Sequence, residues 1–240
     1  MSDTWNIDVP DADRPWPLLA ELSRELDPAD WMLVGGLMVH LHAARAGIAV
    51  PRPTSDVDVV VAIGTGGASF NAVRDRIESL GFAFEPPVGD GGAHKFLRGT
   101  DRIDLMVADR IDGRRVPRVQ GRLVFQVPAG TSALNKAVDC RVQIAGQEPI
   151  ALRVPNALGA LALKGAAYRG DSRESERHLE DAALIACTID DPRTLAAQLA
   201  GSDRARVRSL RDALDERHPA WRPYSELRER GLRALHLLSG

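Results

Sequence analysis

The ten residues RPTSDVDVVV, positions 52–61, constrain the fold of this chain more than any other segment. The run 56–61 has the apolar character of a buried β-strand, but Asp56 and Asp58 place two carboxylates at its start. In a strand, side chains at positions i and i+2 lie on the same face, with Cα atoms about 7 Å apart. Burying two like charges is unfavourable unless a partner compensates them. The pattern therefore predicts an acidic pair that binds a cation.

A third carboxylate is expected from a neighbouring strand. Asp104 stands alone among apolar residues in the strand-like segment 102–108 (RIDLMVA). Mg²⁺ prefers carboxylate oxygens and keeps open positions that phosphate oxygens can fill. We predict that Asp56, Asp58 and Asp104 bind Mg²⁺, with Mn²⁺ as the alternative ion.

A diglycine, Gly35 and Gly36, precedes the acidic pair by about 20 residues and lies between an expected strand and an expected helix. Glycine allows close approach of the backbone, and a helix N-terminus favours anions. Near the acidic pair, Thr54 offers a hydroxyl and Arg52 a charge-assisted hydrogen bond, both suited to phosphate. These residues predict a phosphate-binding site beside the metal site.

The order of the expected elements predicts an α/β (α+β) fold with a mixed sheet, followed by a helical domain. We expect the first 14 residues to be loose. Helices are expected at 15–26, 37–47 and 68–81, and strands at 31–36, 56–63, 82–86, 94–99, 102–108 and 122–128. From about residue 154 only helices are expected, at 154–170, 174–189, 191–201, 202–218 and 224–240, with Pro155 in the first helical turn. We therefore place an α/β domain at residues 1–150 and a helical domain at residues 151–240.

The composition is that of a globular protein, with 44% hydrophobic and 27% charged residues. No apolar run approaches the roughly 18–20 residues that a membrane span needs. The acidic N-terminal segment is unlike a secretory signal, so we expect a cytoplasmic protein without membrane contact. Cys140 and Cys187 lie far apart and match no metal or disulfide spacing, which favours two free thiols.

The net charge of −2 gives no overall attraction to nucleic acid, but the segments 109–122 and 203–211 are rich in arginine. Each is either a solvated basic face or a surface for phosphate groups. Lysine is rare, with only Lys95, Lys136 and Lys164 in the chain. Because Lys164 lies in an apolar helical segment, it is a candidate for a specific role; the alternative is a lysine that extends its amino group to solvent.

Taken together, VGG at 34–36, the helix after it and RPTSDVDVVV resemble the nucleotidyltransferase superfamily that shares the DNA polymerase β palm. More narrowly, the chain is similar to the AbiEii/MenT-type minimal nucleotidyltransferases, which are often toxins of toxin–antitoxin pairs. Their downstream signature is a helix with lysine, small residues and arginine, followed by an acidic helix. The segment LKGAAYRGDSRESERHLEDAALI fits it with Lys164, Arg169 and Asp181. The resemblance extends over residues 34–185, about the middle two-thirds of the chain.

The resemblance implies a role for each of these residues. Asp56 and Asp58 would bind the Mg²⁺ ions that hold an NTP, with pyrophosphate as the leaving group. Asp104 would be either the third ligand or the base that deprotonates the attacking hydroxyl. Lys164, with Arg169 near it, would contact the triphosphate, and Asp181 would face Lys164 from the next helix.

The chain also departs from the group. Leu37 stands where members commonly have serine or threonine after the second glycine, so Thr54 or a backbone N–H would have to replace that hydroxyl. The rear motif usually has a lysine–aspartate pair before its last acid, and here Arg177 and His178 occupy that place. His40 and His42, on the helix after the diglycine, are interpreted as packing or surface residues.

The leading hypothesis is a nucleotidyltransferase that transfers NMP from an NTP to an acceptor hydroxyl. For the toxin branch, the resemblance implies an RNA acceptor such as a tRNA 3′ end, and a cognate antitoxin as partner. Two alternatives stay open: an enzyme that nucleotidylates a small molecule such as an antibiotic, and a nucleotide-binding protein without turnover. An acidic acceptor groove would favour a cationic drug, and basic residues there would favour RNA.

Overall fold

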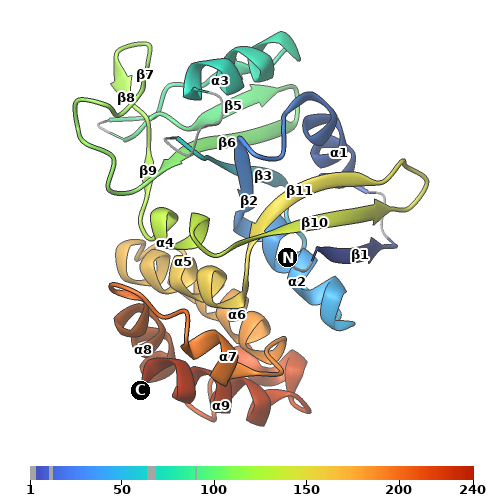
Figure 1. Ribbon diagram of the computed structural model, residues 1–240, viewed down its shortest axis with the longest axis vertical. Helices are drawn as coiled ribbons and strands as arrows, with labels where there is room; N and C mark the ends of the chain where they lie inside the picture. Colours follow the sequence, from blue (N-terminus) through green and yellow to red (C-terminus); the bar gives the residue numbers. More distant parts are fainter. Residues whose placement is uncertain (1–3, 11–12, 64–68, 90) are drawn as a thin grey trace.

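The computed structural model describes residues 4–10, 13–63, 69–89 and 91–240. Its largest sheet has the strand order β2–β3–β6–β5–β4, with β9 paired to β6 as well (Figure 1). The bounds are β2 Trp31–Val34, β3 Asp56–Val61, β4 Ala83–Phe84, β5 Lys95–Arg98, β6 Asp101–Ala108 and β9 Gln126–Val127. β2 is antiparallel to β3, and β3 is parallel to β6, so the sheet is mixed.

The central strands form because their sequences are apolar runs that can be buried on both faces. All four residues of β2 are buried, as are the last three of β3, Val59–Val61. Helices α1 (Trp16–Glu25), α2 (Gly35–Ala46) and α3 (Phe70–Ser79) alternate with strands β2, β3 and β4 along the chain. Gly47 ends α2 in a left-handed conformation and the Ser69 side chain caps α3, both as expected from residue type.

A second sheet has three strands, and two of these strands contradict predictions made from the sequence. It has the order β1–β10–β11, with β1 at Trp5–Val9, β10 at Ala137–Ile144 and β11 at Ile150–Pro155. The first 14 residues are therefore not all loose, because β1 pairs in parallel with β10, a partner more than 130 residues away. Residues 1–3 and 11–12 of that segment, and residue 68 of the expected third helix, lie outside the described residues. Pro155 ends β11 rather than starting a helix.

Among the described residues the remaining elements are helices and one short hairpin, β7 (Arg118–Val119) with β8 (Arg122–Leu123). The helices are α4 Gly130–Leu134, α5 Ala157–Gly170, α6 Ser175–Cys187, α7 Pro192–Ala196, α8 Asp203–Ala213, the 3₁₀ helix η1 Pro219–Tyr224 and α9 Arg228–Ser239. Asn156 precedes α5 and caps it, since its Oδ1 accepts from the backbone N–H of Gly159 at 3.0 Å. The strand expected at 122–128 is divided into β8 and β9.

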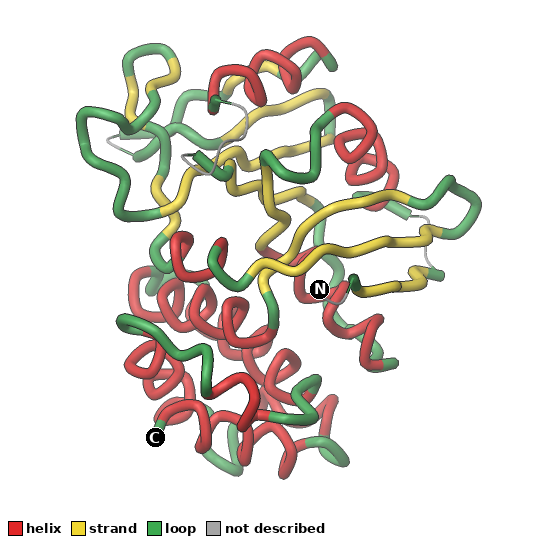
Figure 2. The backbone as a smooth tube through the Cα atoms, in the orientation of Figure 1, coloured by secondary structure: helices red, strands yellow, loops and turns green. Residues whose placement is uncertain are grey.

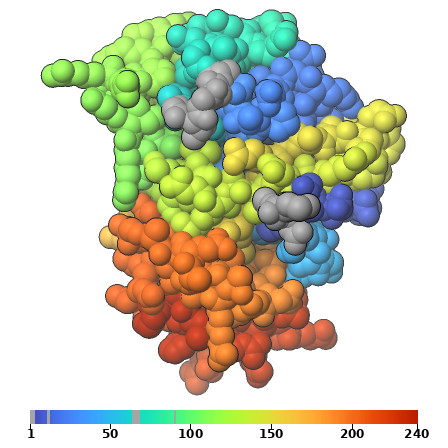
Figure 3. All heavy atoms as spheres, in the orientation of Figure 1, coloured from blue at the N-terminus to red at the C-terminus, as the bar shows by residue number. Residues whose placement is uncertain are grey.

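The C-terminal helices lie together below the sheets in the view of Figures 1 and 2, and they form the lower part of the surface in Figure 3. The buried residues of the sheets and of these helices belong to one continuous hydrophobic core. β11 crosses the division at residue 150, whereas Asn156 separates the last strand from α5. Among the residues that the structure describes, no helix is long and apolar enough to cross a membrane.

Candidate nucleotidyl-transfer site

The parallel pairing of β3 with β6 brings three carboxylates together. In the register of this pair Asp58 lies opposite Asp104, and Asp56 lies opposite Arg102. Each of Asp56, Asp58 and Asp104 offers one oxygen, and these oxygens lie within 4.8 Å of one another. Such spacing allows a single cation to contact all three groups.

Burial makes this acidic cluster dependent on positive charge. The side chains of Asp56 and Asp104 are 12% and 8% exposed. Burial, together with repulsion from Asp56 and Asp104, raises the pKa of Asp58 to about 7. A hard divalent cation fits this donor set, because it would favour the charged form of each carboxylate and bind oxygen ligands without needing nitrogen or sulfur.

Arg102 is a cation already present in the cluster, and the sequence interpretation missed it. Its Nε and Nη2 donate to the two carboxylate oxygens of Asp104 at 2.8 and 2.5 Å, and its Nη1 lies 3.8 Å from Asp56 Oδ2. This bidentate pair raises the pKa of Arg102 above its usual value. The signal for it was available, since Arg102 and Asp104 are two residues apart in a strand and therefore share a face.

The diglycine is explained by what lies next to it. Gly35 has φ +67°, and a Cβ there would lie 1.7 Å from Asp58 Oδ2. A Cβ on Gly36 would lie 2.4 Å from Thr54 Oγ1. The first turn of α2 thus touches the acidic strand through two residues that have no side chain. The two glycines are the first residues of α2 and not a turn before it.

Thr54 and Arg52 have protein partners. Thr54 Oγ1 donates to Asp56 Oδ1 at 3.1 Å, so the hydroxyl holds a carboxylate of the cluster. Arg52 Nη2 donates to Asp181 Oδ1 at 2.7 Å. Both side chains therefore position acidic groups in this structure, and their contact with phosphate stays a prediction.

A buried ion pair links α5 to α6. Lys164 Nζ donates to Asp181 Oδ2 at 2.6 Å, and both side chains are less than a tenth exposed. Burial alone would raise the pKa of Asp181, but Lys164 and Arg52 outweigh it and hold that pKa below its usual value. Lys164 lines the cleft described next, and Asp181 does not. Asp181 is thus placed to orient the Lys164 side chain without lining the cleft itself.

The acidic cluster opens into a cleft of about 930 Å³. Gly35, Asp58, Arg102, Asp104 and Lys164 belong to its lining. Its other walls are formed by Val34, Met38, His94, Met106, Phe125, Val127, Pro128, Leu163, Ala166, Ala167, Gly170, Asp171, Arg173, Glu174 and His178.

Two residues of the rear motif differ in their relation to the cleft. Arg169 is exposed near the end of α5 and is absent from the described lining, so the structure does not bring it to the other predicted residues. His178 lines the cleft, with Nε2 3.6 Å from Asp171 Oδ2. Burial and the nearby Lys164 lower the pKa of His178.

The remaining histidines and thiols of interest are packing groups. His40 Nε2 lies 3.0 Å from the carbonyl oxygen of Arg52, and His42 Nε2 lies 2.9 Å from that of Pro155. Burial lowers the pKa of His42 to about 4, so it is neutral at pH 7. Burial raises the pKa of each of the free thiols Cys140 and Cys187 to about 12.

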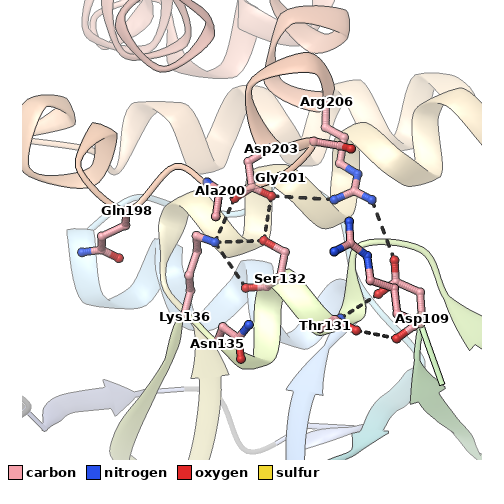
Figure 4. Close-up of a pocket in the computed structure, with 12 residues that line it drawn as sticks. Asp109, Thr131, Ser132, Asn135, Lys136, Gln198, Ala200, Gly201, Asp203 and Arg206 are labelled. Carbon is pink, nitrogen blue, oxygen red and sulfur yellow. Dashed lines mark hydrogen bonds and ion pairs between the residues drawn. The ribbon is translucent and has the colours of Figure 1, made fainter.

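A second cavity of about 430 Å³ lies between α4 and α8 (Figure 4). Lys136 Nζ lies 2.8 Å from Asp203 Oδ2 and donates to Ser132 Oγ at 2.9 Å. Ser132 Oγ in turn donates to Asp203 Oδ1 at 2.6 Å. Because these groups satisfy one another, we interpret the cluster as a connection between the two helices.

Comparison with known proteins assigns this chain to a family. A family model described as "Nucleotidyl transferase AbiEii toxin, Type IV TA system" matches residues 17–236, nearly the whole chain. No curated protein and no solved structure matches. The chain belongs to the AbiEii family and is a nucleotidyltransferase of the toxin–antitoxin class. The resemblance, the fold class and the assignment as an enzyme are thereby confirmed.

Proposed function

We propose that this protein transfers a nucleoside monophosphate from an NTP to a hydroxyl group of an RNA, such as a tRNA 3′ end. It would act as a toxin whose partner is a cognate antitoxin. The observation that carries the proposal is the cluster of three carboxylates, two of which, Asp58 and Asp104, line the same cleft as Lys164. This combination pairs ligands for a divalent ion with a cation for the triphosphate.

Mg²⁺ bound by Asp56, Asp58 and Asp104 would neutralise the charge that develops on the phosphoryl oxygens. The chain's own groups supply the rest of the chemistry. Lys164, oriented by Asp181, binds the triphosphate as a point charge on the other wall of the cleft. The N-terminus of α2 at Gly35 offers backbone N–H groups to the same anion. In this scheme Asp104 serves as a ligand or takes the proton of the attacking hydroxyl.

An RNA acceptor is supported by the segment that leads into the cleft wall. Arg114, Arg115 and Arg118 are exposed in the segment 109–122, which ends shortly before Phe125 in the cleft lining. Exposed arginines in a segment that leads to the cleft wall suit a phosphate backbone and would repel a cationic antibiotic. The second arginine-rich segment gives less support, because Arg208 and Arg211 bond to Ser239 at the end of α9.

We also propose that the chain works as two parts that meet at this site. The sheets supply the acidic cluster, and the helices that follow Asn156 supply Lys164 and Asp181. On this proposal the functional division falls after β11, a few residues beyond the expected boundary at 150.

The test is incorporation of labelled nucleotide. The protein is incubated with each labelled NTP, Mg²⁺ or Mn²⁺, and total RNA, with a reaction lacking RNA as control. The proposal expects metal-dependent labelling of RNA, and Asp58→Asn should abolish it. Asp75→Asn, which changes an exposed carboxylate on α3, should not. Labelling of no RNA by the wild-type protein with any NTP would refute the proposal.

The toxin role is tested separately in growing bacteria. Induced wild-type protein should arrest growth, and the Asp58→Asn variant should not. Growth arrest of equal strength by both proteins would separate toxicity from nucleotidyl transfer and contradict this part of the proposal.

A further inference from the structure

One wall of the cleft is apolar, and neither phosphate groups nor metal ions need an apolar wall. Beyond the acidic cluster the lining becomes apolar, with Met106, Phe125, Val127 and Pro128 on the sheet side. Phe125 is 41% exposed, which is unusual for a large hydrophobic residue in this protein. The ring of His94 lies beside it, with 5.7 Å between ring centroids and 58° between ring planes. An exposed aromatic ring in a concave site is a surface for a flat ligand.

The backbone holds both rings close to the acidic cluster. The N–H of Leu105 donates to the carbonyl oxygen of His94 at 2.7 Å, and the N–H of Val107 donates to that of Phe125 at 3.1 Å. Leu105 and Val107 belong to β6, the strand that supplies Asp104. Because N–H groups two residues apart point to the same edge of a strand, His94 and Phe125 lie along one edge of β6.

Local packing limits the freedom of the two rings. Phe125 N–H donates to the carbonyl oxygen of Ala93 at 2.9 Å, and a Cβ on Gly92 would lie 2.9 Å from Phe125 Cα. His94 Nδ1 lies 2.7 Å from the carbonyl oxygen of Gly92, and this bond sets the orientation of the ring. These contacts hold the backbone of Phe125 and the ring of His94 in place.

We propose that His94 and Phe125 form a stacking platform for a nucleobase, next to the site where the phosphate reacts. The inference rests on the proposed function, because it assigns the base that accompanies the phosphates in the same cleft. Two nucleotides meet in such a reaction, so the base belongs either to the NTP or to the terminal nucleotide of the acceptor. Stacking on an aromatic side chain tolerates any base and typically strengthens binding by roughly 10- to 100-fold.

The decisive comparison uses one ligand that has a base and one that lacks it. A non-hydrolysable NTP analogue and inorganic tripolyphosphate are titrated, each with Mg²⁺, by calorimetry. If the platform holds the base of the NTP, Phe125→Ala weakens binding of the NTP analogue by roughly 10- to 100-fold and leaves binding of tripolyphosphate unchanged. Phe125→Trp, which keeps an aromatic surface, should retain binding of the analogue.

Leu123→Ala is the matched control. Leu123 is 43% exposed, lies two residues before Phe125 and does not line the cleft. Its loss should affect neither ligand, and thermal denaturation of all variants checks that they are folded. If Phe125→Ala weakened the binding of tripolyphosphate and of the analogue equally, the phosphate site would be distorted and the platform would be refuted.

The second source of the base is tested with RNA. An RNA is compared with the same RNA whose 3′-terminal nucleotide lacks its base. If the platform holds the acceptor base, loss of that base weakens binding to the wild-type protein by roughly 10-fold or more, and does not weaken binding to Phe125→Ala.

The outcomes separate this inference from the proposed function. The platform is wrong if the wild-type protein binds the NTP analogue and Phe125→Ala binds that analogue and both RNAs as tightly as the wild-type protein does. The proposed function itself fails, and the platform with it, if the wild-type protein binds neither the analogue nor tripolyphosphate in the presence of Mg²⁺.

Discussion

Replacement of Gly35 by alanine tests whether the diglycine exists to let α2 touch a metal-binding strand. Two effects are expected. The first is backbone strain, because Gly35 has φ +67° and alanine loses about 1–2 kcal/mol in the left-handed region. The second is a collision, since the new Cβ would lie 1.7 Å from Asp58 Oδ2. Only the second effect concerns the site.

The size of the collision follows from the geometry. A Cβ essentially never lies under 3.0 Å from another heavy atom, so the Asp58 carboxylate or α2 has to move by at least 1.3 Å, the difference between 3.0 and 1.7 Å. A misplacement of about 1 Å in a reacting group typically lowers a rate by about 100-fold. We therefore expect Gly35→Ala to lower nucleotide transfer by about 100-fold or more and to weaken metal binding.

Gly47→Ala provides the control, because Gly47 has φ +66° and a Cβ added there would have no atom within 4 Å. Gly47→Ala should lose about 1–2 kcal/mol of stability in urea denaturation from the backbone alone, and Gly35→Ala should lose at least as much. Only Gly35→Ala should lose affinity for Mn²⁺, measured by electron paramagnetic resonance, and activity in the labelling assay. If both variants bind Mn²⁺ and transfer nucleotide equally well, the explanation of the diglycine is wrong.

Three further predictions concern charged groups. Arg102→Met should lower the melting temperature of the metal-free protein. It should also enlarge the increase in melting temperature that Mg²⁺ produces, because the guanidinium no longer competes for the carboxylates. An unchanged increase would contradict this prediction. Lys136→Met should cost about 3 kcal/mol in urea denaturation, because it removes the cation that lies 2.8 Å from the buried Asp203 carboxylate and leaves that carboxylate with the more distant Arg206, at 3.7 Å; Lys136→Met with Asp203→Leu should recover much of that loss. Between pH 6.5 and about 4 the unfolded state protonates His42 and the folded state does not, so the free energy of unfolding should fall by about 3 kcal/mol more in wild type than in His42→Gln. Parallel pH curves would refute the last prediction.

The sequence was sufficient for features that depend on near neighbours. The acidic strand could be predicted because Asp56 and Asp58 are two residues apart in an apolar run, and the two-residue period of a strand is a local property. The apolar helix with Lys164 and the acidic helix with Asp181 were likewise visible as local patterns, and the structure pairs these two side chains. The family match confirms the class of protein that these patterns resemble.

Features that depend on distant partners were not predictable in the same way. β1 is too short to be recognised alone and becomes a strand only by pairing with β10. Pro155 fits the first turn of a helix by residue type, but its place at the end of β11 is set by pairing with Ala137. Local propensity was overruled in both places by hydrogen bonds that a distant strand supplies.

Residue type and spacing are enough to show which side chains carry charge, and which strand and helices present them. Which of these groups meet depends on how the distant segments pack. The register of β3 with β6 sets Asp58 opposite Asp104 and brings Arg102 into the cluster, while Thr54 and Arg52 turn to carboxylates. The edge of β6 places His94 and Phe125 side by side. The physical reason is that charge and periodicity are local, whereas register and burial are settled only when the whole core packs.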